Sequence, residues 1–167
     1  MSRSIVPIRL FDHIGFTGTR KGINFSQQML VRRVFETFLT SGVQFHHGCC
    51  RGADISAHME AERIDGVHIV GHPSTLQSVP TTSKVYWEVR PVEPPLTRNR
   101  TIVDECQYLV ACPGTLKEVL RSGTWATIRY ARSVSRLTTI IWPNGQLETY
   151  HYLSTGGKIC RTSTRHD

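Results

Sequence analysis

The sequence lacks three features, and each absence excludes a class of protein. No apolar run approaches the roughly 20 residues that are needed to cross a bilayer. The N-terminus, MSRSIVPIRLFDH, has no apolar segment followed by a small-residue cleavage site, which argues against a signal peptide and favours a cytoplasmic location. A disulfide framework is also not expected, because the five cysteines are odd in number and two of them are adjacent. We expect reduced thiols instead.

What the sequence does have is the composition of a folded domain with an excess of positive charge. It contains 167 residues, of which 39% are hydrophobic and 20% are charged, as in ordinary globular proteins. We expect one domain over residues 1–157, followed by a short, basic, solvated tail over residues 158–167. The formal net charge of +7 favours anionic partners such as nucleotides, nucleic acids or phosphates, although the basic residues form no long block.

Short apolar runs alternate along the chain with segments of helical periodicity. This alternation predicts an α/β fold, with a Rossmann-like open parallel sheet and helices on both faces. The expected strands are residues 8–18, 43–48, 67–73, 108–114 and 137–143. The expected helices are residues 24–42, 53–66, 98–107 and 124–135. The Asn-Gly pair at 144–145 predicts a tight turn, so residues 146–153 are expected to return as an antiparallel edge strand and complete a C-terminal hairpin.

The expected ends of the first helix follow from its sequence. Ser26 is expected to cap the N-terminus, with Phe25 and Leu30 packed together as a hydrophobic staple, and Gly42 is expected to end the helix. Residues 74–96, by contrast, carry four prolines and little periodicity. A connection of that length is usually functional or mobile.

Five loops carry unusual residues, and all of them lie at the edge of the expected sheet where the carboxyl ends of its strands meet. They are TGTR at 17–20, GCCRGAD at 48–54, GHP at 71–73, TRNR at 97–100 and SGTWAT at 122–127. In open parallel sheets, ligands bind outside the carboxyl ends of the strands, where such loops gather. The sequence therefore predicts one ligand site to which all five loops contribute.

The segment HHGCCRGADISAH at 46–58 allows more than one interpretation. A metal site is disfavoured because His46 and His47 are successive strand residues that point to opposite faces, and because Cys49 and Cys50 lack the spacing of a zinc knuckle. A cysteine nucleophile is chemically allowed, since a helix N-terminus lowers the pKa of a thiol, but no spacing supports it. Packing of the histidines and thiols in a tight turn accounts for these side chains as well.

A phosphate-binding loop needs the fewest assumptions for this segment. Gly48 and Gly52 allow a sharp turn, after which the N–H groups of the next helix face an anion. Arg51 adds a fork of donors that matches a phosphate. Asp54 either caps the helix or contacts a ribose hydroxyl, and His58, one turn later, is placed to hydrogen-bond it.

Two further loops offer similar chemistry. Ser122, Gly123 and Thr124 precede a helix, and their N–H groups and hydroxyls serve either a second anionic or ribose group or a simple helix cap. Trp125 is expected to pack against the sheet rather than stack on a base. The Arg-Asn-Arg run at 98–100 either clamps an anion or begins the next helix in solvent.

These loops resemble those of the SLOG superfamily, which includes the lonely-guy phosphoribohydrolases and the DNA-processing protein A family. GCCRGADISAH is similar to the glycine–x–alanine–arginine–glycine–isoleucine–aspartate loop, followed by alanine–histidine, of the second group. RNRTIVDE is similar to its arginine–asparagine–arginine helix start, and SGTWATIRYA to its serine–glycine turn. Order and spacing agree over most of the chain, and the overall form resembles small stand-alone members from phages and bacteria.

The resemblance implies a Rossmann-like sheet that binds a nucleotide or a nucleotide-derived ligand, without a cofactor, in a homodimer or higher homo-oligomer. Two departures separate the chain from the phosphoribohydrolases. In the phosphoribohydrolases a catalytic glutamate follows the glycine–threonine turn, and Thr127 occupies that position here. In ACPGTLKEVLRSGT, the residues that would correspond to their proline–glycine–glycine motif are spread apart. Cleavage of N-glycosidic bonds by their route is therefore not expected.

The favoured function is the capture of a nucleotide signal, either NAD-derived, such as cyclic ADP-ribose, or a cyclic nucleotide, which in a phage protein would serve anti-defence. One alternative is a hydrolase of a nucleoside phosphate or ADP-ribose derivative, with candidate acid–base residues Asp54, His58, Asp104 and Glu105. Another is a single-stranded DNA-binding protein. No metal and no membrane partner are expected. Arg20, Arg51 and Arg100 are the expected charge partners of the ligand. The full set expected to contact it is Thr17, Gly18, Thr19, Arg20, Gly48, Arg51, Gly52, Ala53, Asp54, His72, Arg98, Asn99, Arg100, Ser122, Gly123, Thr124 and Thr127.

Overall fold

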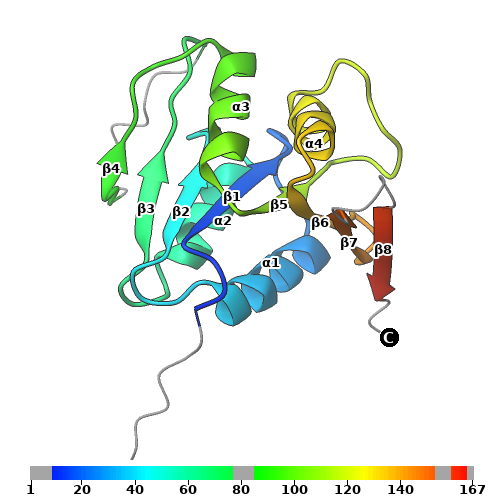
Figure 1. Cartoon of the computed structure of the whole chain (residues 1–167), viewed down its shortest axis with the longest axis horizontal. Coiled ribbons are helices and arrows are strands. Elements are labelled where there is room, and N and C mark those ends of the chain that lie inside the picture. The colour runs from blue at the N-terminus through cyan, green and yellow to red at the C-terminus, as the bar shows by residue number, and fades with distance from the viewer. Residues whose placement is uncertain (1–8, 77–84, 153–158, 165–167) are drawn as a thin grey trace, which may run out of the picture.

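The computed structural model describes residues 9–76, 85–152 and 159–164, and its strands there form one eight-stranded sheet (Figure 1). The strands are β1 His13–Gly18, β2 Gln44–His47, β3 His68–Gly71, β4 Glu88–Val89, β5 Tyr108–Cys112, β6 Leu137–Ile141, β7 Leu147–Tyr152 and β8 Ile159–Thr164. The helices are α1 Phe25–Phe38, α2 Ala53–Ala61, α3 Pro95–Glu105 and α4 Gly123–Ser133.

The strands are ordered β4-β3-β2-β1-β5-β6-β7-β8, and those from β4 to β6 in this order run parallel. The predicted Rossmann-like, mainly parallel sheet is therefore confirmed. The chain moves outward from β1 to β4 and then returns to the other side of β1 with β5. The strand order thus reverses between β1 and β5. In open sheets of this kind, ligands bind at such a switch point, outside the carboxyl ends of the strands.

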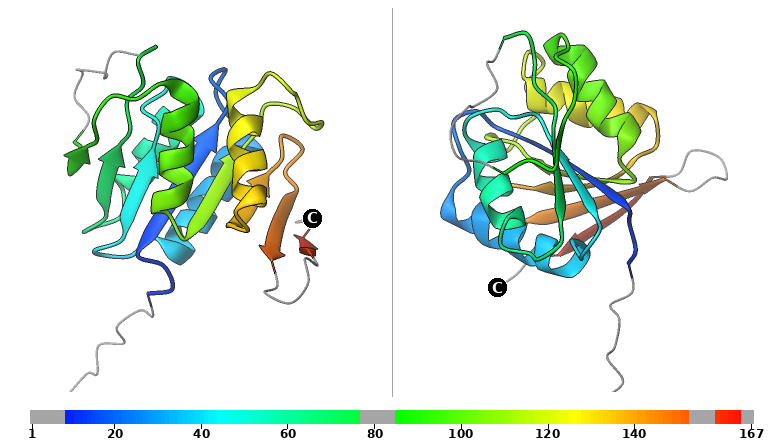
Figure 2. Two further views of the ribbon diagram at one scale, coloured as in Figure 1. Left: turned by 45° about the horizontal axis from the view of Figure 1, so that its top comes forward. Right: turned by 90° about the vertical axis from the view of Figure 1, so that its left-hand side faces the viewer.

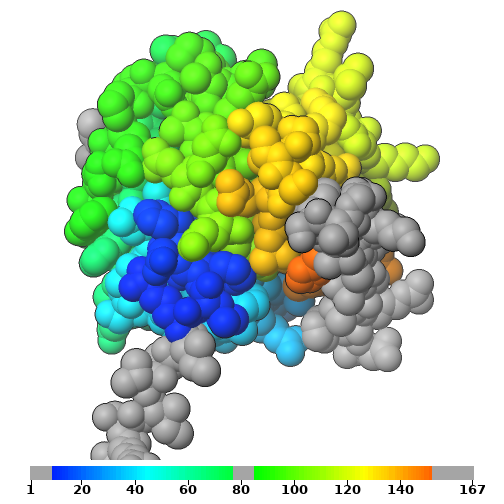
Figure 3. Space-filling view, viewed as in Figure 1, coloured from blue at the N-terminus to red at the C-terminus, as the bar shows by residue number. Residues whose placement is uncertain are grey.

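Helices cover both faces of the sheet, as the alternation of elements predicted. Figure 2 shows α3 and α4 on one face and α1 and α2 on the other, and Figure 3 shows the surface that α3 and α4 present. The larger core lies between α1, α2 and the sheet, where the rings of Phe16, Phe35 and Phe45 contact one another. Under α4, Trp125 packs against Trp142, as expected. Within the described ranges, no helix combines the length and apolarity that a membrane crossing requires.

The N-terminal cap of α1 differs from the predicted one. Asn24, not Ser26, caps the helix: its side chain accepts a hydrogen bond from the Gln27 N–H at 2.9 Å. The side chain of Gln27 accepts in turn from the Asn24 N–H at 3.3 Å, which completes a capping box. Phe25 is 78% exposed, so the predicted hydrophobic staple is also wrong.

Gly42 does not end α1 as predicted. The helix ends at Phe38, and Leu39 is its C-cap. Gly42 has a φ of 83°, and its N–H donates to the Gly66 carbonyl at 2.7 Å. Because a side chain is strained at such a φ, glycine here shapes the turn that leads into β2.

The C-terminal part of the sheet extends beyond the predicted hairpin. β7 pairs antiparallel with β6 as predicted, but it is not the edge strand, because β8 pairs antiparallel with it. Residues 159–164, which we expected in a solvated tail, thus form the last strand. Residue 158 and residues 165–167 of that expected tail lie outside the described residues, as do residues 1–8 and 77–84.

The capping box of α1 leads to a stability prediction. We expect Asn24→Ala to lower the free energy of unfolding by about 1–2 kcal/mol, because the Gln27 N–H loses its acceptor and the bond from Asn24 Nδ2 to the Pro143 carbonyl is lost. Ser26→Ala should change it by less than about 0.5 kcal/mol, since Ser26 is exposed. Urea unfolding of both variants is the measurement. Equal losses in the two variants would show that Asn24 is not the cap.

Candidate functional site

A cavity of about 450 Å³ opens at the carboxyl ends of the strands, beside the switch point between β1 and β5. Segments far apart in the sequence line it. They are the end of β1 and the residues that follow it, the loop between β2 and α2 with the start of α2, the part of α3 from Pro95 to Ile102, and the residues at the start of α4. The structure therefore brings together four of the five loops that the sequence singled out. The fifth, residues 71–73, does not line the cavity.

At this edge of the sheet, the side chain of Arg98 is buried and bonds to several segments of the chain. It lies near the start of α3 and is only 3% exposed. Its Nη1 donates to the carbonyl oxygens of Gly48 and His72, the second at 2.7 Å. Its Nη2 lies 3.5 Å from Cys50 Sγ, and its Nε donates to Asn99 Oδ1 at 2.9 Å. One guanidinium thus ties the ends of β2 and β3 to α3. Glycine is needed at position 48, since a Cβ there would lie 2.6 Å from Nη1.

The loop between β2 and α2 is held by hydrogen bonds within the protein. The Cys50 N–H donates to Asp54 Oδ2 at 3.1 Å, and the Ala53 N–H donates to the Thr19 carbonyl at 3.0 Å. Gly52 turns the backbone with a φ of 86° and packs against the loop after β1. The N–H groups of Cys50 and Ala53 therefore already have acceptors within the protein.

Asp54 lies at the cavity and is almost completely buried. It is 4% exposed, and this loss of solvent raises the pKa of its carboxyl group to about 6, against the opposing effects of the Cys50 N–H and of Arg98. Asp54 is not the cap of α2, because Gly52 is the N-cap residue and no side chain bonds to the helix there. The carboxylate accepts instead from the loop that leads into its own helix.

The N-terminus of α4 faces the same cavity. Ser122 caps the helix, and its side chain accepts a hydrogen bond from the Trp125 N–H at 3.4 Å. The first turn of α4 contains no acidic residue, whereas that of α2 contains Asp54. The positive end of the α4 dipole is therefore not neutralised by a carboxylate of its own helix, which favours an anion at this position.

The backbone of Gly123 is open at this helix terminus. A Cβ added there would have only Asn99 Nδ2 nearby, 4.0 Å away. Thr124 and Thr127 line the cavity beside it, and the Thr127 hydroxyl donates to the Gly123 carbonyl at 2.9 Å. A ligand atom can therefore approach the first N–H groups of α4 closely.

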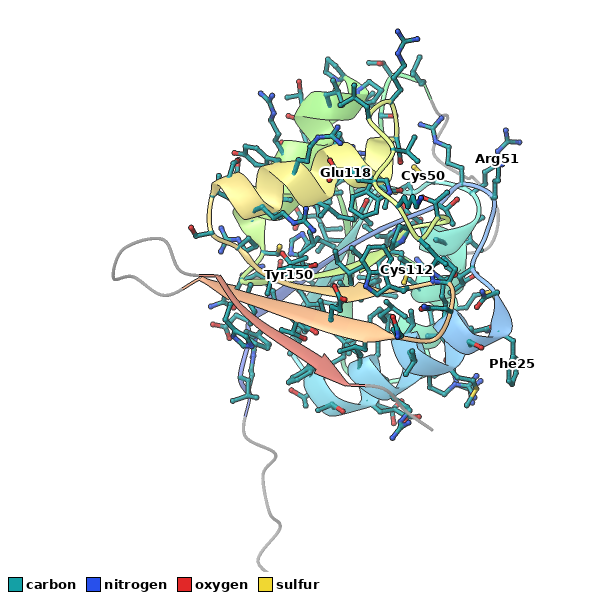
Figure 4. The ribbon with its side chains drawn as sticks, turned by 90° about the vertical axis from the view of Figure 1, so that its right-hand side faces the viewer. Phe25, Cys50, Arg51, Cys112, Glu118 and Tyr150 are labelled. Atoms are coloured by element: carbon teal, nitrogen blue, oxygen red, sulfur yellow. The ribbon has the colours of Figure 1, made fainter. Side chains whose placement is uncertain are left out.

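The rim of the cavity carries exposed positive charge. The exposed cationic side chains that line it are Arg20, Lys21 and Arg121. Arg51 is exposed as well, but it projects outward, unlike its buried neighbour Cys50, and lines none of the cavities described (Figure 4). Arg100 lines a second cavity beside α4, where its guanidinium lies 5.4 Å from the centre of the Tyr130 ring. Of the expected charge partners, only Arg20 lies at the main cavity.

Most of the residues expected to contact the ligand line the main cavity. They are Thr17, Gly18, Thr19, Arg20, Gly48, Asp54, Arg98, Asn99, Ser122, Gly123, Thr124 and Thr127. The expected residues that do not line it are Arg51, Gly52, Ala53, His72 and Arg100.

Sequence reasoning missed several residues that line the cavity. They are Phe16, Lys21, Cys50, Pro95, Leu96, Ile102 and Arg121. Lys21 and Arg121 each flank a loop that the sequence did single out, so extending those loops by one residue would have found them. Leu96 lines the cavity because α3 begins at Pro95, three residues before the predicted helix start.

His58, one of the candidate acid–base residues, lies outside the cavity. Its Nδ1 is 2.9 Å from His47 Nε2, and its Nε2 is 2.9 Å from Glu62 Oε1. His46 makes its contacts on the other face of the sheet, with His13 and His72. The prediction that His46 and His47 point to opposite faces is therefore confirmed.

Two more of the candidate acid–base residues, Asp104 and Glu105, also lie outside the cavity. Asp104 accepts a hydrogen bond from the Tyr130 hydroxyl at 2.9 Å. Glu105 accepts from Arg90 Nη2 at 2.9 Å. Among the cavity-lining residues in the described part of the chain, Asp54 carries the only carboxyl group. The described residues thus bring no pair of carboxyl groups into the cavity to share acid and base roles.

Cys49, the first of the two adjacent cysteines, shows no sign of activation. Cys49 is 3% exposed and has a φ of 57°, and burial raises the pKa of its thiol to about 11. A thiol needs the opposite shift to act as a nucleophile at neutral pH. The free cysteines Cys49, Cys50, Cys106 and Cys112 are all buried, which agrees with packing as the role of these side chains.

No family model matches the chain, and no curated protein matches it. Solved structures do share its fold. DNA processing protein A from Helicobacter pylori, whose structure describes a single-stranded DNA-binding mode, aligns over 77% of this chain with a TM-score of 0.51 and 18% identity. DNA processing protein A from Streptococcus pneumoniae aligns over 78% of it with a TM-score of 0.59 and 20% identity.

These similarities concern the fold. The chain spans 64% and 50% of the lengths of the two proteins, in the order given. Both are of the kind whose loops the sequence resembles, so the Rossmann-like fold implied by that resemblance is confirmed.

The burial of Asp54 predicts a pH-dependent stability. Its folded-state pKa, about 6, is above the ordinary value of 3.8, so folding favours the protonated carboxyl group. The wild type should therefore lose up to about 3 kcal/mol relative to Asp54→Asn as the pH rises from about 4 to 6, with no further relative loss above that. Urea unfolding of both proteins across this range is the measurement. Asp65→Asn, which removes an exposed carboxylate, is the control. Parallel curves for the wild type and Asp54→Asn would contradict the expectation.

Proposed function

We propose that the cavity binds a nucleotide or a nucleotide-derived ligand through a phosphate group and does not hydrolyse it. The observation that carries this proposal is the N-terminus of α4, which has no acidic residue in its first turn and opens at Gly123 into the cavity at the switch point. The volume of about 450 Å³ is within the usual range of small-molecule pockets. Arg20, Lys21 and Arg121 add positive charge at the rim.

Binding is favoured over hydrolysis because the described residues place no second carboxyl group and no histidine in the cavity beside Asp54. Asp54 carries its only carboxyl group in the described residues, and that carboxylate is engaged by the Cys50 N–H. Hydrolysis of a phosphate or of an N-glycosidic bond needs a group that activates water and a group that protonates the leaving group. The hydroxyls of Thr124 and Thr127 are suited to hold a ligand but not to serve as that pair.

Single-stranded DNA is a second candidate ligand. The specific support is the exposed positive charge at the rim together with the formal net charge of +7. The Helicobacter pylori protein of the same fold is described as binding single-stranded DNA. A stacking platform of aromatic side chains is typical of such binding. In the described part of the chain, Phe16 is the only aromatic residue that lines the cavity, and it is buried, so we place DNA second.

A negative charge introduced at Gly123 tests the proposal. Glutamate at the first position of α4 suits the helix dipole, but it places a negative charge where the phosphate is expected. In calorimetric titrations with AMP, ADP-ribose and NAD⁺, the wild type should bind at least one with a Kd below about 10 µM. Gly123→Glu should bind that ligand at least about tenfold more weakly than Gly123→Gln, its neutral match in size.

Two results would contradict this expectation. The first is the absence of binding by any of these nucleotides. The second is equal affinity in Gly123→Glu and Gly123→Gln. The same variants, titrated with an oligothymidylate at increasing salt, separate the two candidates: tight oligonucleotide binding that falls steeply with salt, without nucleotide binding, would favour DNA.

A further inference from the structure

A cluster of two histidines and a glutamate lies beneath α3, apart from the residues that line the proposed nucleotide site. His46 is on β2, His72 directly follows β3, and Glu105 ends α3. His46 Nδ1 lies 2.9 Å from His72 Nε2 and 3.5 Å from Glu105 Oε2, and His72 Nε2 lies 3.9 Å from the same oxygen. We propose that these three side chains bind one divalent transition-metal ion of the zinc class.

The three distances fit a single tetrahedral ion. Imidazole nitrogens and carboxylate oxygens bind Zn²⁺ at about 2.0–2.1 Å, which places neighbouring ligand atoms of a tetrahedron about 3.3–3.4 Å apart. The observed separations of 2.9, 3.5 and 3.9 Å bracket that value. Two histidines and one glutamate, with water in the fourth position, are a ligand set that zinc uses in proteins.

The fold brings the glutamate to the histidines. Gly15 of β1 faces α3, and a Cβ there would lie 2.9 Å from Cys106 Sγ and 3.1 Å from Ile102 Cγ2. Glycine at this position therefore lets the end of α3 pack closely on the sheet, which places Glu105 above His46. His46 is completely buried, so packing limits its rotamers.

Two further side chains orient the proposed ligands. His13 Nδ1 lies 3.0 Å from His46 Nε2, and this contact directs the opposite ring nitrogen of His46 toward the other two ligands. Arg90 donates to Glu105 Oε2 from Nε at 3.2 Å and from Nη2 at 2.9 Å, and it also pairs with Glu88. When the ion takes that oxygen, Glu88 and the second oxygen of Glu105 remain as partners for the guanidinium.

The proposed site differs from our expectation of no metal, and the reason lies in the fold. Near His46 in the chain, His47 points to the other face of the sheet and makes its contact with His58 there. The partners of His46 come from β3 and α3, which only the folded chain brings to it.

Titration of the full, untagged chain with Co²⁺ and then Zn²⁺ tests the proposal. One equivalent of Co²⁺ should produce the visible absorption of a four-coordinate nitrogen and oxygen site, and one equivalent of Zn²⁺ should abolish it. Zn²⁺ should also raise the melting temperature of the wild type, because the ion binds the folded state.

Variants identify the ligands. Glu105→Gln preserves size at a partly exposed position, and we expect it to weaken Zn²⁺ binding by at least about 100-fold, since even residues that only orient ligands contribute about 10–100-fold. His13→Asn should weaken Zn²⁺ binding by about 10-fold or more, because His13 orients the ligand His46. His68→Gln removes a histidine that stacks on Trp87, outside the cluster, and should bind as the wild type does.

Three results would overturn the proposal. They are the absence of stoichiometric binding, a Zn²⁺ affinity that Glu105→Gln leaves unchanged, and an intense near-ultraviolet sulfur-to-cobalt band, which would place the ion on cysteines. Melting curves without metal show whether each variant folds. Nucleotide titrations of Glu105→Gln keep this outcome separate from that of the nucleotide proposal, because Glu105 does not line the main cavity.

Discussion

The carboxyl edge of the sheet depends on the burial of one cation, the guanidinium of Arg98. A buried charge is costly unless hydrogen-bond acceptors surround it. The acceptors here are the carbonyls of Gly48 and His72, with the thiol of Cys50 and the carboxyl group of Asp54 nearby. Because these groups belong to separate segments, satisfying one side chain fixes several loops relative to one another. The cavity is the space that remains among them.

Buried and exposed groups have different roles at this cavity. Arg98, Asp54 and the loop between β2 and α2 satisfy one another and shape the floor of the cavity. The groups left for an anion are the start of α4 and the cations of the rim. In the loop between β2 and α2, the Cys50 and Ala53 N–H groups are held by bonds within the protein, and the anion site that we propose is the start of α4.

The features that could be predicted from the sequence are those with a local signal. The alternation of apolar runs and helical segments predicted the parallel sheet, and the Asn-Gly pair at 144–145 predicted the antiparallel pairing of β7. The placement of loops after strands predicted where most of the cavity-lining residues lie. These rules need only the order of residues along the chain.

What could not be predicted depends on packing over long distances. In the Arg-Asn-Arg run, the first arginine is buried and the second is exposed. The helix begins at Pro95, three residues before the start that the sequence predicted. β8 needs β7 as its partner, and its own residues looked like a solvated tail. Glu105 meets His46 and His72 only because Gly15 lets α3 approach the sheet.

A crystal structure of the full chain grown with the tightest-binding nucleotide tests the account most directly. The account predicts a phosphate within hydrogen-bond distance of the Gly123 and Thr124 N–H groups, with Arg98 still bound to the carbonyls of Gly48 and His72. A phosphate seated on the loop between β2 and α2 beside Arg51, or one bound away from α4 altogether, would contradict it.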